Sequence, residues 1–123
     1  MNNSSAAQAY ARTTQTTSSP REIEAQALLK AARQLQDVQT NWGGADKSLH
    51  EALLFNRRLW TIFISAMQNA ENEQPLEVRQ KILNIGVFML NQTVDMQVDP
   101  QPAKLTSMIE INRNLAAGLS GRA

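Results

Sequence analysis

The chain has 123 residues, of which 42% are hydrophobic and 19% charged, and this length and composition fit one domain with one modest core. Its formal net charge of +1 argues against a dedicated nucleic-acid surface. It contains no cysteine, which excludes a disulfide framework, a thiol nucleophile and a thiolate metal site. No apolar run reaches the roughly 18 residues of a membrane span and the polar N-terminus lacks the apolar core of a secretory signal, so we expect a cytoplasmic protein without membrane insertion.

The first 19 residues consist almost entirely of Asn, Ser, Thr, Gln and Ala, and Tyr10 is their only large apolar side chain. Such a segment cannot bury enough apolar surface to offset the entropy of ordering it. We therefore predict a flexible polar N-terminal arm over residues 1–19, a single helical domain over residues 20–119 and a short C-terminal tail over residues 120–123.

The first two predicted helices are bounded by residues with clear end preferences. One runs from Pro20, which suits a first helical position, to about Asn41, where Gly43-Gly44 ends it. Its broad apolar face comprises Ile23, Ala27, Leu28, Ala31, Leu35, Val38 and Trp42. The second helix covers Leu49–Met67, with Asp46 as its cap.

The helix over residues 49–67 has an unusually wide apolar arc, roughly 200° at 100° per residue, about twice that of an ordinary surface helix. We therefore expect it to be the central helix of a bundle, with neighbours on both sides. The arc contains Leu49, Ala52, Leu53, Phe55, Leu59, Trp60, Ile62, Phe63, Ile64, Ala66 and Met67.

Pro75 starts a third helix, which carries two opposed apolar stripes and ends before Pro100. One stripe contains Val78, Ile82, Ile85, Met89 and Met96. The other, about 150–180° away around the helix, contains Leu76, Leu83, Val87, Leu90, Val94 and Val98. Either this helix is sandwiched between neighbours, or one stripe forms the wall of a groove for a partner helix.

A last helix is predicted from about Ala103 to Gly118, with an asparagine near the centre of its apolar arc. That residue, Asn112, matches Asn56 in the central helix. A buried amide without partners costs roughly 1–3 kcal/mol, so we predict that both amides are largely buried and bond each other or nearby backbone. Together, these elements predict an all-α fold, a small bundle of about four helices.

No constellation for catalysis or metal binding is visible. His50, the only histidine, has no second ligand at helical spacing, and no Ser, Thr or Lys has a visible activating base. There is no phosphate-binding glycine loop and no acidic pair typical of an acid–base dyad. We therefore expect no catalytic residue, metal or cofactor, and we do not expect an enzyme.

Arg57-Arg58 is the only tandem basic pair. Adjacent residues on a helix diverge by about 100°, so the two side chains cannot share one target face. Each either pairs with a carboxylate on a neighbouring helix, worth roughly 0–1 kcal/mol when exposed, or contacts an acidic partner or RNA phosphate.

Four stretches carry a family resemblance: Glu24–Ala32 (EAQALLKAA), Ala52–Phe63 (ALLFNRRLWTIF), Ile85–Phe88 (IGVF) and Ile109–Arg113 (IEINR). In this order they resemble FlaF, the flagellar biosynthesis regulatory proteins of alphaproteobacteria, and they cover roughly residues 20–119. The most specific part of the resemblance is the pair of motifs NRRLW at residues 56–60 and EINR at residues 110–113, in this order and at this separation. The resemblance implies one FlaF-like helical domain.

The resemblance also implies a role in flagellum assembly and in flagellin production. FlaF-like proteins are thought to bind flagellin in the cytoplasm and to assist its secretion, working opposite FlbT, a regulator of flagellin mRNA translation. Flagellin is the implied partner and FlbT a second candidate. A helix with two apolar stripes is compatible with holding an amphipathic flagellin helix by helix-in-groove packing, which would block premature polymerisation.

Two alternatives remain at this point. One is a post-transcriptional regulator that acts with FlbT on flagellin mRNA translation, using Arg57, Arg58, Arg113 and the arm. Direct nucleic-acid binding is not expected, because phosphate binding requires several converging cations and the charges are scattered. The other is an adaptor of the export machinery that does not contact flagellin.

The predicted partner surface combines the two asparagine-containing stretches with exposed apolar residues of the third helix. Its residues are Leu54, Asn56, Arg57, Arg58, Trp60, Glu110, Asn112 and Arg113.

Overall fold

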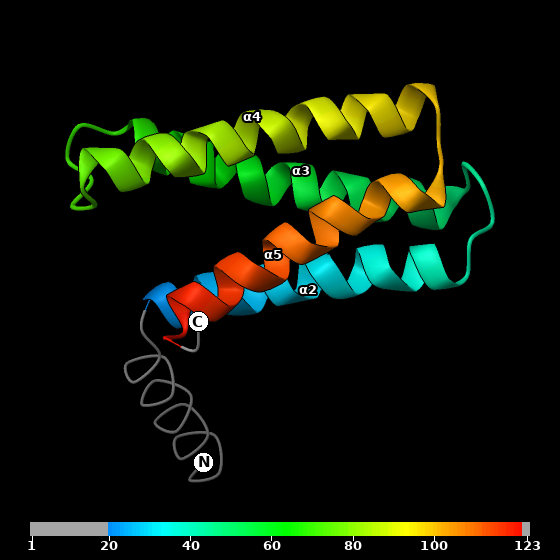
Figure 1. The fold of residues 1–123 in the computed structure, drawn as a ribbon, viewed down its shortest axis with the longest axis horizontal. Coiled ribbons are helices and arrows are strands. Elements are labelled where there is room, and N and C mark those ends of the chain that lie inside the picture. Colours follow the sequence, from blue (N-terminus) through cyan, green and yellow to red (C-terminus); the bar gives the residue numbers. More distant parts are fainter. Residues whose placement is uncertain (1–19, 122–123) are drawn as a thin grey trace, which may run out of the picture.

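The computed structural model describes residues 20–121, and these residues form four α-helices (Figure 1). They are α2 (Pro20–Thr40), α3 (Lys47–Gln68), α4 (Leu76–Val98) and α5 (Leu105–Leu119), with a short 3-10 helix η1 (Pro102–Lys104) before α5. No strand occurs between residues 20 and 121. The predicted all-α fold and the order of four helices are confirmed. The predicted arm over residues 1–19 and the last two residues of the tail lie outside the described residues.

The helix ends follow from local chemistry. Gly44 takes a φ of 80° in the turn after α2, a backbone conformation that favours glycine. Asp46 is the N-cap of α3, as predicted: its carboxylate accepts a hydrogen bond from the Leu49 N–H at 3.0 Å. The Ser48 hydroxyl donates to the same carboxylate at 2.6 Å, and these bonds lower the pKa of Asp46.

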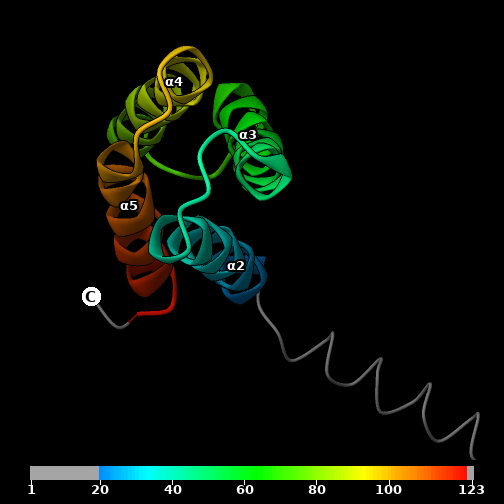
Figure 2. The ribbon, with the colours of Figure 1, turned by 90° about the vertical axis from the view of Figure 1, so that its right-hand side faces the viewer.

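The four helices surround a common centre (Figure 2). The most extensive contact joins α2 and α5; α3 packs on α4, and α2 also packs on α3. The prediction that α3 has neighbours on both sides is confirmed. Its central position is shared, however, because α2 also lies between two helices, α3 and α5.

Helices α3 and α4 approach each other closely at Gly86. A Cβ atom at this position would lie 2.6 Å from Ile64 Cγ1 and 3.6 Å from Trp60 Cε3. The Trp60 ring is fully buried and meets the Phe63 ring edge to face, with centroids 5.4 Å apart. The absence of a side chain at Gly86 thus lets α4 pack directly onto the largest core residue.

A polar layer crosses the centre of the core. Asn112 Nδ2 donates to Asn56 Oδ1 at 2.8 Å, and Trp60 Nε1 donates to Asn112 Oδ1 at 2.9 Å. Asn56 Nδ2 points to the Met89 sulfur at 3.7 Å. Both amides are fully buried, so the prediction that they are buried and bond each other is confirmed. The layer joins α3, α4 and α5.

The two apolar stripes of α4 have different surroundings. Met89 and Met96 of the first stripe are fully buried, whereas Val87 and Val94 of the second are each 56% exposed and Val98 is 78% exposed. The interpretation that this helix is sandwiched between neighbours is therefore wrong, because α4 packs mainly on α3 and leaves its other face uncovered.

Candidate helix-binding groove

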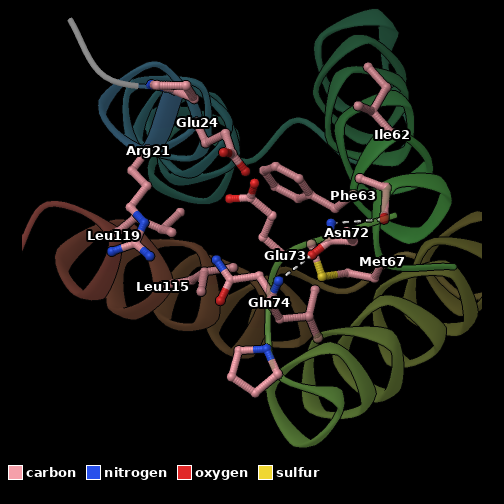
Figure 3. Close-up of a pocket in the computed structure, with 14 residues that line it drawn as sticks. Arg21, Glu24, Ile62, Phe63, Met67, Asn72, Glu73, Gln74, Leu115 and Leu119 are labelled. Carbon is pink, nitrogen blue, oxygen red and sulfur yellow. Dashed lines mark hydrogen bonds between the residues drawn. The ribbon is translucent and has the colours of Figure 1, made fainter. Parts of the chain in front are cut away.

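The bundle opens at the end where α2 begins and α5 ends. Figure 1 shows the α2–α5 pair diverging from the α3–α4 pair toward this end. Between the two pairs lies a groove of about 750 Å³ (Figure 3). Its apolar lining comprises Ile62, Phe63, Met67, Ile82, Leu115 and Leu119.

The floor of the groove comes mainly from the last turns of α3. Phe63 and Met67 are buried at its base, while Ile62 is 65% exposed at its edge. The wide apolar arc of α3 predicted that Ile62 would be covered by a neighbouring helix, and this prediction is wrong. The α2–α5 pair diverges from α3 toward the end of this helix (Figure 1). The apolar residues of the α3 arc that this pair does not cover therefore line the groove.

The loop between α3 and α4 closes one side of the groove and is held by its own polar side chains. Asn72 Nδ2 donates to the Ala66 carbonyl at 3.0 Å, and Asn72 Oδ1 accepts from the Gln74 N–H at 2.8 Å (Figure 3). The Arg79 guanidinium donates to the Asn69 carbonyl at 3.2 Å. A cation at a helix C-terminus also complements the helix dipole. The loop is therefore a fixed wall of the groove.

Charged side chains stand at the mouth of the groove. Figure 3 shows the carboxylates of Glu24 and Glu73 pointing toward one another across it, with Arg21 nearby on α2. Burial raises the pKa of Glu24, and the positive charge of Arg21 opposes this in part. A ligand that covered the groove would desolvate Glu24 further and raise its pKa again.

A family model described as flagellar protein FlaF matches residues 6–119. The chain belongs to the FlaF family. Neither a curated protein nor a solved structure matches it significantly. Membership in FlaF implies a role in flagellar biogenesis, and every residue that lines the groove falls within the matched range.

The partner residues predicted from the sequence of this FlaF-family chain fall into two groups. Asn56, Trp60 and Asn112 are fully buried, so in this packing their side chains contact only the protein interior. Leu54 and Arg58 line a shallow cavity of about 460 Å³ between α2 and α3. Burial thus removes three of the residues that we predicted as direct contacts.

The remaining predicted residues, Arg57, Glu110 and Arg113, are exposed on α3 and α5. Arg113 Nη2 reaches Gln36 of α2 at 3.4 Å. Within residues 20–121, neither Arg57 nor Arg58 forms an ion pair with a neighbouring helix, so that interpretation of the tandem arginines is wrong.

None of the eight predicted residues lines the groove. The sequence signals that could have located it are the excess width of the α3 arc, which includes Ile62, and the first α4 stripe, which includes Ile82. Two of the groove's apolar residues, Ile62 and Phe63, end the Ala52–Phe63 stretch that carries the FlaF resemblance, although neither is among the eight predicted residues.

No group of three or more His, Cys, Asp or Glu side chains among residues 20–121 could hold a metal ion. No helix in that range is both long enough and apolar enough to cross a bilayer.

Proposed function

We propose that this FlaF-family chain binds flagellin in the cytoplasm as a secretion chaperone, and that an amphipathic helix of flagellin lies in the groove at the open end of the bundle. The observation that carries the proposal is the groove itself, a concave apolar surface bounded by fixed polar residues. An apolar floor with a polar rim is the usual anatomy of a protein interface. Helix-in-groove recognition uses this arrangement, with apolar anchors repeated along one helix face.

The groove offers such anchors on three sides. Ile62 stands exposed on one wall, Ile82 lies on the wall contributed by α4, and Leu119 lies on the wall contributed by α5. Fully burying an aliphatic side chain contributes about 1.5–3 kcal/mol, whereas association itself costs roughly 4–15 kcal/mol. Several anchors must therefore be covered together, which suits a helix better than an extended peptide with one apolar residue.

The proposed biological role is to cover the apolar face of a flagellin helix before export. Flagellin subunits polymerise through apolar helix faces, so a chaperone that occupies one of them keeps the subunit unassembled before export. The proposed role is binding and needs no catalytic residue. An effect on flagellin synthesis, with or without FlbT, then follows indirectly from the amount of flagellin that is sequestered.

Calorimetric titration of the full chain with monomeric flagellin tests this proposal. We expect binding near one to one with a negative heat-capacity change, which marks the burial of apolar surface. Titration with flagellin lacking either terminal helix would identify the segment that is bound. Absence of heat and of co-elution, with the chain shown to be folded, would refute flagellin binding and favour the adaptor.

A matched pair of substitutions tests the surface. Ile62 and Ile23 are both exposed isoleucines on helices, at 65% and 58%, but only Ile62 lines the groove. Ile62→Glu is expected to weaken flagellin binding at least tenfold, whereas Ile23→Glu should leave it unchanged. Equal effects of the two substitutions would place flagellin elsewhere on the molecule.

RNA binding by the full chain that falls steeply with salt concentration would instead support the post-transcriptional regulator.

A further inference from the structure

The second apolar stripe of α4, which we call the outer stripe, is mostly exposed, and only Leu83 and Leu90 within it are half-buried. It consists of Leu76, Leu83, Val87, Leu90, Val94 and Val98. Four of these, Leu76, Val87, Val94 and Val98, are among the most exposed large hydrophobic residues of the described chain. None of the six lines the groove. The outer stripe is therefore a separate apolar surface, facing away from α3.

The spacing along the outer stripe is that of a coiled-coil seam. Leucine recurs every seven residues at 76, 83 and 90, and valine occupies 87 and 94, three residues before or four residues after a leucine. In heptad notation the three leucines are at d and Val87 and Val94 are at a, which is the combination that favours two parallel strands. The seam weakens at its C-terminal end, where Gln97 is at d and Val98 at e. The remaining a position holds Gln80, and a single polar residue at such a position sets register.

The charges around this surface are consistent with an interface between identical helices. Residues 82–94 contain no Lys, Arg, Asp or Glu. The charges that flank this stretch are neutralised within the chain, because Lys81 pairs with Glu77 at 3.4 Å and Asp95 pairs with Lys104 at 2.9 Å. Between residues 82 and 94 no like charges would therefore repel when two outer stripes meet, and the core of protein interfaces is typically depleted of charge.

We propose that the outer stripe is covered by the outer stripe of a second copy of this chain, in a parallel two-stranded coiled coil over the 23 residues of α4. In the parallel arrangement the two Gln80 amides meet and can bond each other. In an antiparallel pair each amide would lie against apolar side chains near Val94. Three heptads form a short seam, so we expect the dimer to dissociate reversibly.

This arrangement leaves both grooves open. The seam lies on the uncovered side of α4, while the groove lies between α3, α5 and the start of α2. The dimer therefore presents two grooves, and it forms whether or not these grooves take flagellin. Self-association and partner binding can be tested independently.

Sedimentation equilibrium of the full chain, from about 1 µM to 1 mM and without flagellin, measures the self-association. We expect a monomer–dimer equilibrium, and Val94→Glu is expected to weaken it at least tenfold. Ile62→Glu, an equally polar change at an exposed residue outside the outer stripe, should leave it unchanged. Circular dichroism shows that each variant remains helical. A monomer throughout the range, or a dimer that Val94→Glu does not weaken, would overturn the proposal.

Strand direction has its own test, because the chain contains no cysteine. In the parallel pair two Val94→Cys side chains meet and form an intermolecular disulfide under mild oxidation. In an antiparallel pair centred on Val87 they would be about 20 Å apart. Phe88→Cys, at a heptad position pointing away from the seam, is the control and should not form the intermolecular disulfide. A dimer that Val94→Cys does not cross-link would overturn the parallel arrangement.

Discussion

Replacement of Asn112 by leucine removes an acceptor and a donor from the centre of the core at once. The substitution leaves the Trp60 Nε1–H without its 2.9 Å acceptor and Asn56 Oδ1 without its 2.8 Å donor. Each buried group left unpaired costs about 1–3 kcal/mol, so the free energy of unfolding is expected to fall by about 2–6 kcal/mol. That is a large share of the roughly 5–15 kcal/mol typical of a domain, and it lowers Tm by on the order of 10–30 °C.

Urea unfolding followed by far-ultraviolet circular dichroism measures this loss without relying on the fluorescence of Trp60. Asn114→Leu makes the same substitution at an exposed position two residues further along α5 and should change the free energy of unfolding by less than about 0.5 kcal/mol. If Asn112→Leu cost no more than this control, the polar layer would contribute nothing to stability and the reasoning would be refuted.

The double variant Asn56→Leu, Asn112→Leu extends the test. Removing both partners of a buried hydrogen bond costs less than removing one, because no unpaired amide remains between them. The double variant is therefore expected to lose less stability than the sum of the two single variants. Additive losses would mean that the 2.8 Å bond between the amides carries no coupling energy.

Gly86→Ala is expected to lower the free energy of unfolding by up to about 2 kcal/mol, because its Cβ would lie 2.6 Å from Ile64 Cγ1 and overpacking outweighs the gain in helix propensity. Gly118→Ala, with nothing within 4 Å, should raise it by roughly 0.5–1 kcal/mol in the same urea assay. Glu24→Gln is expected to raise the free energy of unfolding at pH 7, because burial raises the pKa of Glu24 and so disfavours its ionised form in the folded protein. In urea titrations from pH 7 to pH 4, this gain should shrink as the pH falls through the Glu24 pKa toward the ordinary value of 4.5, since the wild-type carboxyl then takes up its proton.

Each of these predictions has a clear contrary result. Equal stabilisation by the two alanine substitutions would mean that Ile64 moves aside freely and that α3 and α4 do not depend on the glycine at position 86. A gain from Glu24→Gln that did not change with pH would mean that the carboxyl at position 24 titrates as it does in the unfolded chain.

The local parts of the fold were predictable because single residues decide them. Proline and glycine limit which backbone conformations are possible, so Gly43-Gly44, Pro75 and Pro100 mark the helix ends. The Asp46 cap and the bond between Asn56 and Asn112 were predictable for a similar reason, since a polar group at an apolar position must find a partner.

The groove could not be predicted, because it depends on which part of an apolar arc a neighbouring helix covers. Periodicity gives the width of the α3 arc. It does not show that neighbouring helices bury Phe63 and leave Ile62 exposed. The lining also brings together Arg21, Ile82 and Leu119, which are far apart in the sequence. The same limit explains why Trp60, in the most specific motif, was predicted as a contact although it fills the core.

The pairing of the first and last helices sets the order of events during synthesis. The apolar face of α2 finds its most extensive partner in α5, and the central amide bond joins residues 56 positions apart. Contacts of such long separation cannot form until the last helix has left the ribosome. A chain halted before Leu105 would leave the face of α2 exposed, which makes truncated products targets for proteolysis and makes folding an event that follows translation.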